Sequence, residues 1–404
     1  MNLGAKLLKK NNFTHLCEKN CIIAPQKLVF MQTAVCILNW NGVALLQHYL
    51  PTVVEHSQLD NVQIYVIDNA STDESVSFIR QNYPQIGVIQ LPENLGFTGG
   101  YNEGLRHIEA DIFVLLNSDV AVTPHWLAPL IHAIQYNERL FAVQPKIKAD
   151  KQRSHFEYAG AAGGFIDRWG YVYCRGRFFD QTEFDKGQYN NALSVFWASG
   201  ACMVVRAKTY FQLGGLDASF FAHFEEIDLC WRAKRAGYEI WCIPTSTVYH
   251  LGGGSLPYGN PRKLYLNFRN NLVMLLKNLP TAQLFSTLPL RLLLDMVAAT
   301  KSLLTGKTRD AQMILRATWH FLTHLPQNYR LRQTANKQVQ LAQLHNIPYI
   351  YAGWYEGSII WDYFVKKKRI TPLPHSALSN PNMHESYNTP PIQLLDDALN
   401  NENP

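Results

Sequence analysis

Polar residues that follow two apolar runs of the chain could hold a divalent cation. Asp68 follows the run Val62–Ile67, and Asn117 and Asp119 follow the run Ile112–Leu116. Mg²⁺ and Mn²⁺ prefer hard oxygen ligands, and such a cation neutralises the charge that a diphosphate leaving group acquires. Asp119 is therefore the candidate metal ligand. Taken alone, the same Asn-Ser-Asp tripeptide is also typical of an ordinary polar turn.

A second cluster places three acids within four positions, at Glu225, Glu226 and Asp228. Apolar residues surround this cluster in the sequence, and burial beside apolar surface raises the pKa of a carboxyl group towards that of a useful general base. The alternative is an acidic helix start that offsets the helix dipole, with Arg232 pairing to Asp228 one turn later. Both can hold, with Asp228 and Arg232 structural and Glu226 chemical.

His250 ends an apolar run and is closely followed by three glycines, 252–254. A lone histidine is more often a structural hydrogen-bonding group than a ligand. The glycines, however, would let the backbone approach a phosphate closely. Both interpretations stay open on the residues alone.

The elements that must position these residues are predicted by apolar periodicity. Short runs rich in branched residues alternate with helical patterns, at Thr33–Leu38, Val62–Ile67, Ile86–Leu91 and Ile112–Leu116. This alternation is typical of βαβ units, so we expect an α/β fold with a mostly parallel sheet and flanking helices. Small and polar residues follow each run, and ligands bind beyond the carboxyl ends of such strands.

Further elements are predicted outside this pattern. Ser71 and Glu74 have the spacing of a capping box, which predicts that a helix begins there. Residues 150–195 combine glycines with aromatic residues and indicate an irregular, partly antiparallel insertion to which we assign no chemistry. Helices are expected at 262–278, 281–304 and 309–324.

Composition and charge limit the class of protein. The 404-residue chain is 47% hydrophobic and 17% charged, which excludes overall disorder. Its net charge of +6 is uneven, because residues 261–370 hold sixteen Lys or Arg and four Asp or Glu. Charged residues interrupt the best apolar stretch, 284–304, so a simple membrane span is not expected. Seven cysteines without a pairing pattern fit a reducing cytoplasm.

Together, these motifs resemble the inverting family-two glycosyltransferases of the GT-A fold, in particular the rhamnosyltransferase-like branch that builds bacterial surface polysaccharides. The resemblance extends over residues 33–278. It is carried by VCILNWNG at 35–42, VIDNASTD at 66–73, ENLGF and GGYN within 93–102, LLNSD at 115–119, GGLD through Arg232 at 214–232, and VYH at 248–250.

The resemblance implies a domain organisation. A GT-A domain would occupy residues 31–278, with a nucleotide-binding half at 31–145 and an acceptor half at 146–278. Around it we expect an N-terminal extension at 1–30, a basic amphipathic helical region at 279–370 and a disordered tail at 371–404.

The resemblance also implies nucleotide and metal contacts. Asp68 resembles the carboxylate that reads a pyrimidine base, and Asn39 and Asn94 resemble residues around the nucleoside. The Asn-Ser-Asp tripeptide occupies the place of the family's Asp-x-Asp metal motif. Asn117 departs from it by replacing a carboxylate with an amide, which leaves Asp119 as the ligand of Mg²⁺ or Mn²⁺ and Asn117 as a ribose or diphosphate contact.

Glu226 matches the position of the family's catalytic base, which is usually aspartate. His250 stands 24 residues further on, as does a metal-coordinating histidine in the related galactofuranosyltransferases, so it is the implied second metal ligand. The implied reaction is a single displacement in which Glu226 takes a proton from an acceptor hydroxyl and the anomeric carbon inverts.

The acceptor side is implied at Trp197, Ser199, Gly200 and Glu225. An aromatic ring there could stack on a sugar face. A tryptophan in an apolar run, however, is more often part of the core.

The implied partners are a nucleotide-sugar donor, either dTDP-rhamnose or a UDP-sugar, and a saccharide or lipid-linked acceptor. The basic amphipathic helices favour a peripheral place on the cytoplasmic face of the plasma membrane. Alternatively, the helices at 281–324 form a homodimer interface.

Two other functions are weighed against this reading. A nucleotidyltransferase would need a glycine-rich phosphate loop with a basic residue after the first strand, and Asn39–Gly42 supplies neither. A nucleic-acid-binding module is permitted by the charge count, but the strongly apolar character of the same region disfavours it, and no nucleic acid partner is expected.

Overall fold

The structure, a computed structural model, describes residues 31–252, 260–344, 347, 349–369 and 371–374. The expected N-terminal extension at 1–30 and positions 375–404 of the expected tail lie outside the described residues.

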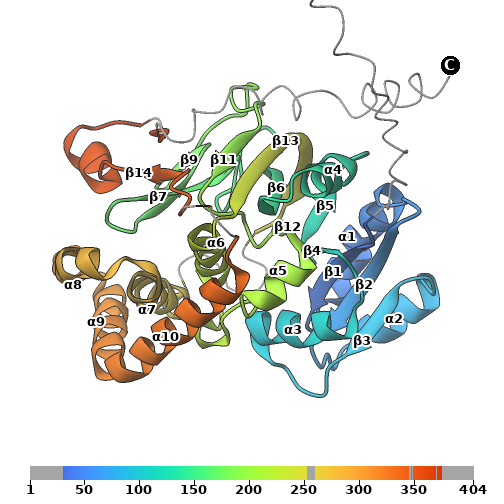
Figure 1. The fold of residues 1–404 in the computed structure, drawn as a ribbon, viewed down its shortest axis with the longest axis horizontal. Helices are drawn as coiled ribbons and strands as arrows, with labels where there is room; N and C mark the ends of the chain where they lie inside the picture. The colour runs from blue at the N-terminus through green and yellow to red at the C-terminus, as the bar shows by residue number, and fades with distance from the viewer. Residues whose placement is uncertain (1–30, 253–259, 345–346, 348, 370, 375–404) are drawn as a thin grey trace, which may run out of the picture. The chain divides into compact units, whose positions relative to one another are not determined.

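A nine-stranded sheet of mixed direction carries the site (Figure 1). Its order is β11-β13-β6-β12-β4-β1-β2-β3, and β5 pairs with β13. The strands are β1 Thr33–Asn39, β2 Val62–Asp68, β3 Gly87–Gln90, β4 Ile112–Asn117, β5 Val120–Val122, β6 Leu140–Ala149, β11 Leu193–Val195, β12 Cys202–Arg206 and β13 Glu239–His250. The four predicted strands form β1 to β4 and pair in parallel, which confirms the predicted α/β class.

Alternating residues of β1 face two separate cores, as the pleat of a strand requires. Val35 and Ile37 pack on one side with Leu46 and Leu50 of α1, whereas Cys36 packs on the other. The helices that cover the sheet or connect its strands are α1 Val43–His56, α2 Ser75–Asn82, α3 Gly96–Gly104, α4 Ala128–Tyr136, α5 Ala207–Gln212 and α6 Glu225–Arg235. Short 3-10 turns occupy Leu105–His107 and Ala218–Phe220.

The predicted capping box before α2 does not form. Helix α2 begins at Ser75, whose backbone N–H donates to Oδ1 of Asp73 at 3.1 Å. The Ser71 hydroxyl instead accepts hydrogen bonds from the side chain of Asn39 and the backbone N–H of Asn41. The prediction was wrong because Ser71 serves the neighbouring strand end rather than the helix.

The insertion at 150–195 forms most of a second, five-stranded sheet in the order β10-β9-β8-β7-β14. Its strands are β7 Gly164–Asp167, β8 Val172–Cys174, β9 Arg177–Phe178, β10 Gln181–Thr182 and β14 Trp354–Tyr355. The last of these comes from the C-terminal region and pairs in parallel with β7.

Helices dominate the chain after the central sheet. They are α7 Pro261–Asn278, α8 Thr281–Leu304, α9 Thr308–Thr323 and α10 Leu325–Ala342, followed by a π-helical turn at Trp361–Val365. The first three were predicted and α10 was not. Helix α9 packs against α7 and α8, while α10 contacts α5, α6 and α7.

Within the described residues, α8 alone is long and apolar enough to cross a membrane by length and composition. Two of the charges that interrupt it are buried against the protein rather than exposed. The Arg291 guanidinium lies 3.3 Å from the Asp295 carboxylate and 3.8 Å from the centre of the Tyr171 ring. One face of α8 is therefore held by the protein itself.

Candidate active site

The register of β1 and β2 brings the first predicted nucleotide contacts together. Asn39 pairs with Asp68 at the carboxyl ends of the two strands, and its amide donates to Asp68 Oδ1 at 3.2 Å. The backbone N–H of Ser71 donates to the other oxygen of Asp68 at 3.0 Å. Among the described residues, the buried Oδ1 of Asn39 has no hydrogen-bond partner. It is an unsatisfied, buried acceptor at the strand ends.

Asn94 lies at the next strand end and is exposed. Its Oδ1 accepts hydrogen bonds from the side chain of Asn69 and the backbone N–H of Gly96, both at 2.9 Å. Asn94 thus shapes the start of α3, beside the predicted nucleoside site.

The two predicted metal ligands are brought together by strand pairing. His250 of β13 lies opposite Val120 of β5, so its ring reaches the preceding residue, Asp119. His250 Nε2 is 3.1 Å from Asp119 Oδ1 and 3.4 Å from the side-chain nitrogen of Asn117. Asp119 and His250 are both buried.

Glu157, which the sequence analysis did not select, faces the other ring nitrogen of His250 at 3.5 Å. It is placed there because its backbone N–H donates to Ile147 of β6. Burial by itself lowers the pKa of His250, but hydrogen bonding and charge from Asp119 and Glu157 outweigh it and raise the pKa to about 10. No local pattern marked Glu157, since it lies in an insertion without recognisable chemistry.

The side chains of Asp119 and His250 fit a divalent cation whose remaining coordination positions are filled by a bound ligand. No cluster of three or more His, Cys, Asp or Glu side chains in the described part of the chain forms a ready-made metal site. Asp119 offers one donor, and the facing nitrogen of His250 would become a second once a bound cation displaces its proton. Glu157 stands where metal-binding histidines commonly have a carboxylate. The remaining positions would fall to diphosphate oxygens and water.

The two glutamates at the start of α6 are held in a low-dielectric environment. Burial raises the pKa of Glu226 to about 7, against the lowering effect of backbone N–H groups at the helix start. Burial and the adjacent Glu226 charge raise the pKa of Glu225 well above its ordinary value. One carboxyl oxygen of each is buried and has no hydrogen-bond partner among the described residues. Glu226 therefore has the protonation range of a general base.

Gly200 connects this base to the metal-ligand end of the sheet. A Cβ atom on residue 200 would lie 3.8 Å from Cβ of Glu226 and 3.8 Å from the ring of Phe97 in α3. The carbonyl of Ala201, the residue after Gly200, accepts a hydrogen bond of 3.0 Å from the backbone N–H of Asn117. The predicted acceptor loop thus lies between Glu226 and the strand end that carries Asp119.

Trp197 and Ser199 of the same loop are structural. The Trp197 ring is 3% exposed, covers Gly164 and donates its N–H to the carbonyl of Phe165 at 3.0 Å. The Ser199 hydroxyl donates to the carbonyl of Ala159 at 2.7 Å. This packing leaves no free face of the Trp197 ring, so the ring does not stack on a sugar as the sequence suggested.

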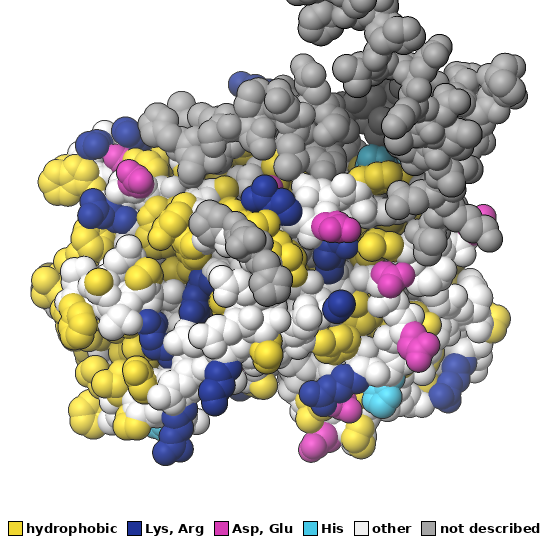
Figure 2. Space-filling view, viewed as in Figure 1, with side chains coloured by type: hydrophobic (Ala, Val, Ile, Leu, Met, Phe, Trp, Pro, Cys, Tyr) yellow, Lys and Arg dark blue, Asp and Glu magenta, His cyan; other side chains and the backbone are white. Residues whose placement is uncertain are grey.

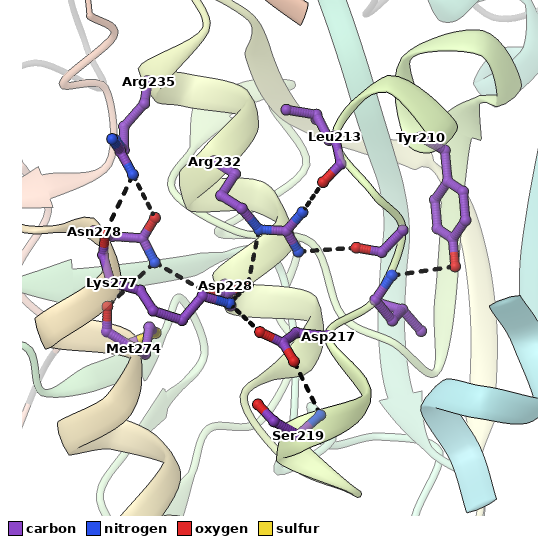
Figure 3. A network of polar contacts seen from close by, with 12 residues as sticks. Tyr210, Leu213, Asp217, Ser219, Asp228, Arg232, Arg235, Met274, Lys277 and Asn278 are labelled. Carbon is purple, nitrogen blue, oxygen red and sulfur yellow. Dashed lines mark hydrogen bonds and ion pairs between the residues drawn. The ribbon is translucent and has the colours of Figure 1, made fainter. Parts of the chain in front are cut away.

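A buried polar network fixes α6 to α7 (Figure 3). Asp228 accepts hydrogen bonds, each of 2.8 Å, from Arg232, Lys277 and Asn278. The predicted pair of Asp228 and Arg232 is confirmed. The bond from Lys277 to Asp228 ties the end of α7 to the helix that carries Glu226, and its bond to Asp217 ties it to the turn at Ala218–Phe220.

Comparison with known proteins defines the class of the chain. A family model described as glycosyltransferase-like family 2 matches residues 31–272. The chain belongs to this family, and its architecture is the GT-A fold that the sequence predicted. Family membership favours glycosyl transfer over nucleotidyl transfer.

The chain is also similar to rhamnosyltransferases. It is 26% identical over 205 residues to the N-acetylglucosaminyl-diphospho-decaprenol L-rhamnosyltransferase of Mycobacterium tuberculosis, covering 47% of this chain and 66% of that enzyme. It is 22% identical over 211 residues to rhamnosyltransferase WbbL of Escherichia coli, covering 50% of this chain and 79% of that protein. The match therefore spans slightly less than two thirds of the mycobacterial relative.

Among solved structures, S. aureus TarS 1-349 in complex with UDP-GlcNAc superposes with a TM-score of 0.50 at 14% identity. The match covers 77% of this chain and 89% of that chain. At this identity the likeness concerns the fold alone.

Proposed function

We propose that this chain is an inverting glycosyltransferase. It would move a sugar from dTDP-rhamnose or a UDP-sugar to a hydroxyl of a saccharide or lipid-linked acceptor in the synthesis of bacterial surface polysaccharide. The observation that carries the proposal is the closeness of Glu226 to Gly200, where a Cβ atom would lie 3.8 Å from that of Glu226. This places a carboxyl group of raised pKa beside the loop whose Ala201 carbonyl accepts a hydrogen bond from the backbone N–H of Asn117.

The donor would bind at the strand ends. Asp68 would read the base, Asn39 would offer its unpartnered oxygen to the nucleoside, and Asn117 would contact the ribose or diphosphate. Asp119 and His250 would hold Mg²⁺ or Mn²⁺, which when bound neutralises charge on the departing diphosphate. Glu157 would keep the His250 ring oriented.

The transfer follows from the position of Glu226. Its carboxylate accepts the proton of the acceptor hydroxyl as that oxygen bonds to the anomeric carbon. The bond between this carbon and the diphosphate oxygen breaks in the same step, and the nucleoside diphosphate leaves with the electron pair. Because attack and departure occur on opposite faces, the anomeric configuration inverts.

Helices α8 and α9, which follow the predicted acceptor half in the chain, suit a membrane surface. Helices α8 and α9 expose Phe285, Leu293, Leu304 and Trp319, and Figure 2 shows apolar side chains gathered over the same edge of the molecule. Basic residues of the same region would attract anionic headgroups by about 1 kcal/mol each. The name of the mycobacterial relative, which includes a diphospho-decaprenol, agrees with an acceptor carried on a lipid.

A screen of nucleotide sugars for slow hydrolysis tests the proposed function. The full chain with Mn²⁺ is incubated with each donor, and released nucleoside diphosphate and sugar are detected by mass spectrometry. We expect hydrolysis of dTDP-rhamnose or of one UDP-sugar. Absence of hydrolysis and of Mn²⁺-dependent binding with every pyrimidine donor contradicts the proposal.

A further inference from the structure

A groove lined by arginines opens between α7 and α9. Its volume is about 570 Å³. Four of its lining residues are arginines, namely Arg262, Arg269, Arg309 and Arg316, and Tyr265 lies among them. Arg262, Arg309 and Arg316 are exposed, so a solute can reach them.

None of the four arginines makes an ion pair with a carboxylate in the described part of the chain, unlike Arg139, Arg153, Arg232 and Arg291. Arg262 lies over the Phe221 ring at 4.4 Å, and Arg316 lies 5.5 Å from the Tyr265 ring. Arg269 donates to the backbone carbonyls of Ser219 and Phe220. Like charges gathered without a counter-charge raise the local attraction for an anion.

The planar guanidinium group suits phosphate recognition in particular. Its fork of N–H donors matches two phosphate oxygens at once. Arg269 is held by the carbonyls of Ser219 and Phe220, which leaves the exposed Arg262, Arg309 and Arg316 to supply such forks. Three cationic groups in one groove suit the charge of a diphosphate better than that of a single carboxylate.

The groove adjoins the catalytic helix. Phe221 forms part of its wall and lies in the loop that precedes Glu225 and Glu226. The same ring would be 3.4 Å from a Cβ on Gly96, at the start of α3. An anion in the groove thus lies beside the loop that joins the donor side to the base.

The groove also borders the exposed apolar surface. On α9, Arg309 and Arg316 are seven residues apart and share one side of the helix with Met313. Trp319, which is 69% exposed, follows Arg316 by three residues, and His320, whose Nδ1 lies 2.7 Å from the Tyr265 hydroxyl, follows Arg316 by four. Adjacent parts of α9 could therefore bind an amphiphile with an anionic head group. The arginines would contact the head group, and the exposed apolar residues would contact the apolar chain.

We propose that this arginine groove binds the diphosphate of a lipid-linked acceptor and so presents the acceptor sugar to Glu226. The inference rests on the proposed function and adds the site at which the diphosphate of such an acceptor would bind. The competing sources of phosphate are the nucleotide donor and the headgroups of the bilayer.

Binding is measured by titration calorimetry on the full chain with farnesyl diphosphate, inorganic pyrophosphate, and UDP with Mn²⁺. We expect farnesyl diphosphate to bind more tightly than pyrophosphate. The Arg309→Gln/Arg316→Gln double variant should weaken it at least about tenfold, because charge-assisted hydrogen bonds are lost. Arg330→Gln, which changes an exposed arginine of α10, is the matched control. The Arg309→Lys/Arg316→Lys double variant should recover part of the affinity for farnesyl diphosphate, because it restores the positive charges.

Four results overturn the inference. The first is an unchanged affinity for farnesyl diphosphate in Arg309→Gln/Arg316→Gln, and the second is an equal loss of UDP affinity in that variant. The third is equal affinity for pyrophosphate and farnesyl diphosphate, which would indicate an adventitious ion only. The fourth is arginine-dependent binding to phosphatidylglycerol vesicles without binding of farnesyl diphosphate. If the unaltered chain hydrolyses a nucleotide sugar but does not bind farnesyl diphosphate, the inference fails while the proposed function stands. If no donor is hydrolysed or bound, the proposed function itself fails.

Discussion

The ring of His250 lies between two carboxylates, with Asp119 3.1 Å from one nitrogen and Glu157 3.5 Å from the other. Three separate segments supply these residues. Asn117 also borders the Asp119 side of the ring, with its side-chain nitrogen 3.4 Å from Nε2. The Asp119 side suits a cation, and the Glu157 side suits orientation of the imidazole.

Asp119→Ala should abolish Mn²⁺-dependent binding of UDP or dTDP, because the substitution removes the carboxylate ligand. Calorimetry with and without the metal measures this effect, and circular dichroism checks the fold. Asp60→Ala, at an exposed acid outside the site, is the control. Full activity of the unaltered chain in excess chelator would contradict the metal assignment.

Glu157→Gln should weaken Mn²⁺ affinity by about 10- to 100-fold without abolishing it, as loss of an outer-shell partner does. The amide keeps the shape of the side chain but removes its charge. Glu183→Gln, in the same insertion, serves for comparison. If Glu157→Gln and the unaltered chain bind Mn²⁺ equally well, the contact between Glu157 and His250 does not support metal binding.

Glu226→Gln should lower kcat by about 10²- to 10⁴-fold and leave donor affinity nearly unchanged, because a positioned general base is lost. In the unaltered chain, activity should rise as pH increases through about 7, since only the deprotonated carboxylate accepts a proton. The rise is read from kcat against pH. If Glu225→Gln is inactive and Glu226→Gln is active, the base is the neighbouring residue.

Lys277→Met should lower the free energy of unfolding by about 3 to 5 kcal/mol, the usual cost of breaking a buried charge network. The lost ammonium group bridges Asp228 and Asp217, so both carboxylates lose a buried partner. Urea denaturation measures the change. Lys337→Met, at an exposed position of α10, should have little effect, and similar costs at both positions would show that the network adds no stability.

Phosphatidylglycerol vesicles should sediment the full chain at low salt, and high salt should reduce the bound fraction because it screens the lysines and arginines. Trp319→Asp should reduce it further by placing a charge on the exposed apolar surface. His125→Asp, far from α9 in the sequence, controls for added negative charge. A chain that remains in the supernatant and is dimeric in solution favours the alternative in which α8 and α9 form an interface between copies.

The parallel strands β1 to β4 of the central sheet were predictable because their determinants are local. Each is a short run of mostly apolar residues, and in β1 and β4 burial of both faces makes the run recognisable. The pair of Asp228 and Arg232 was equally predictable, since residues four apart lie on one side of a helix. The family motifs added the identity of Asp119, Glu226 and His250 as candidates.

Helix α10 could not be predicted because tertiary contacts stabilise it. Its Arg332 donates to the carbonyls of Leu276 and Leu279, each at 2.7 Å, at the end of α7. Trp197 illustrates a related limit, because an apolar run does not distinguish a ring that covers Gly164 from one that faces a ligand.

The sequence by itself determined the parallel strands β1 to β4 and the polar residues at their ends, because strand and helix periodicity are properties of neighbouring residues. The tertiary structure alone decided that Glu157 faces His250 and that arginines of α7 and α9 line one groove. Those contacts depend on the register of β13 against β5 and on helix packing, which join residues far apart in the chain. No local pattern carries that information.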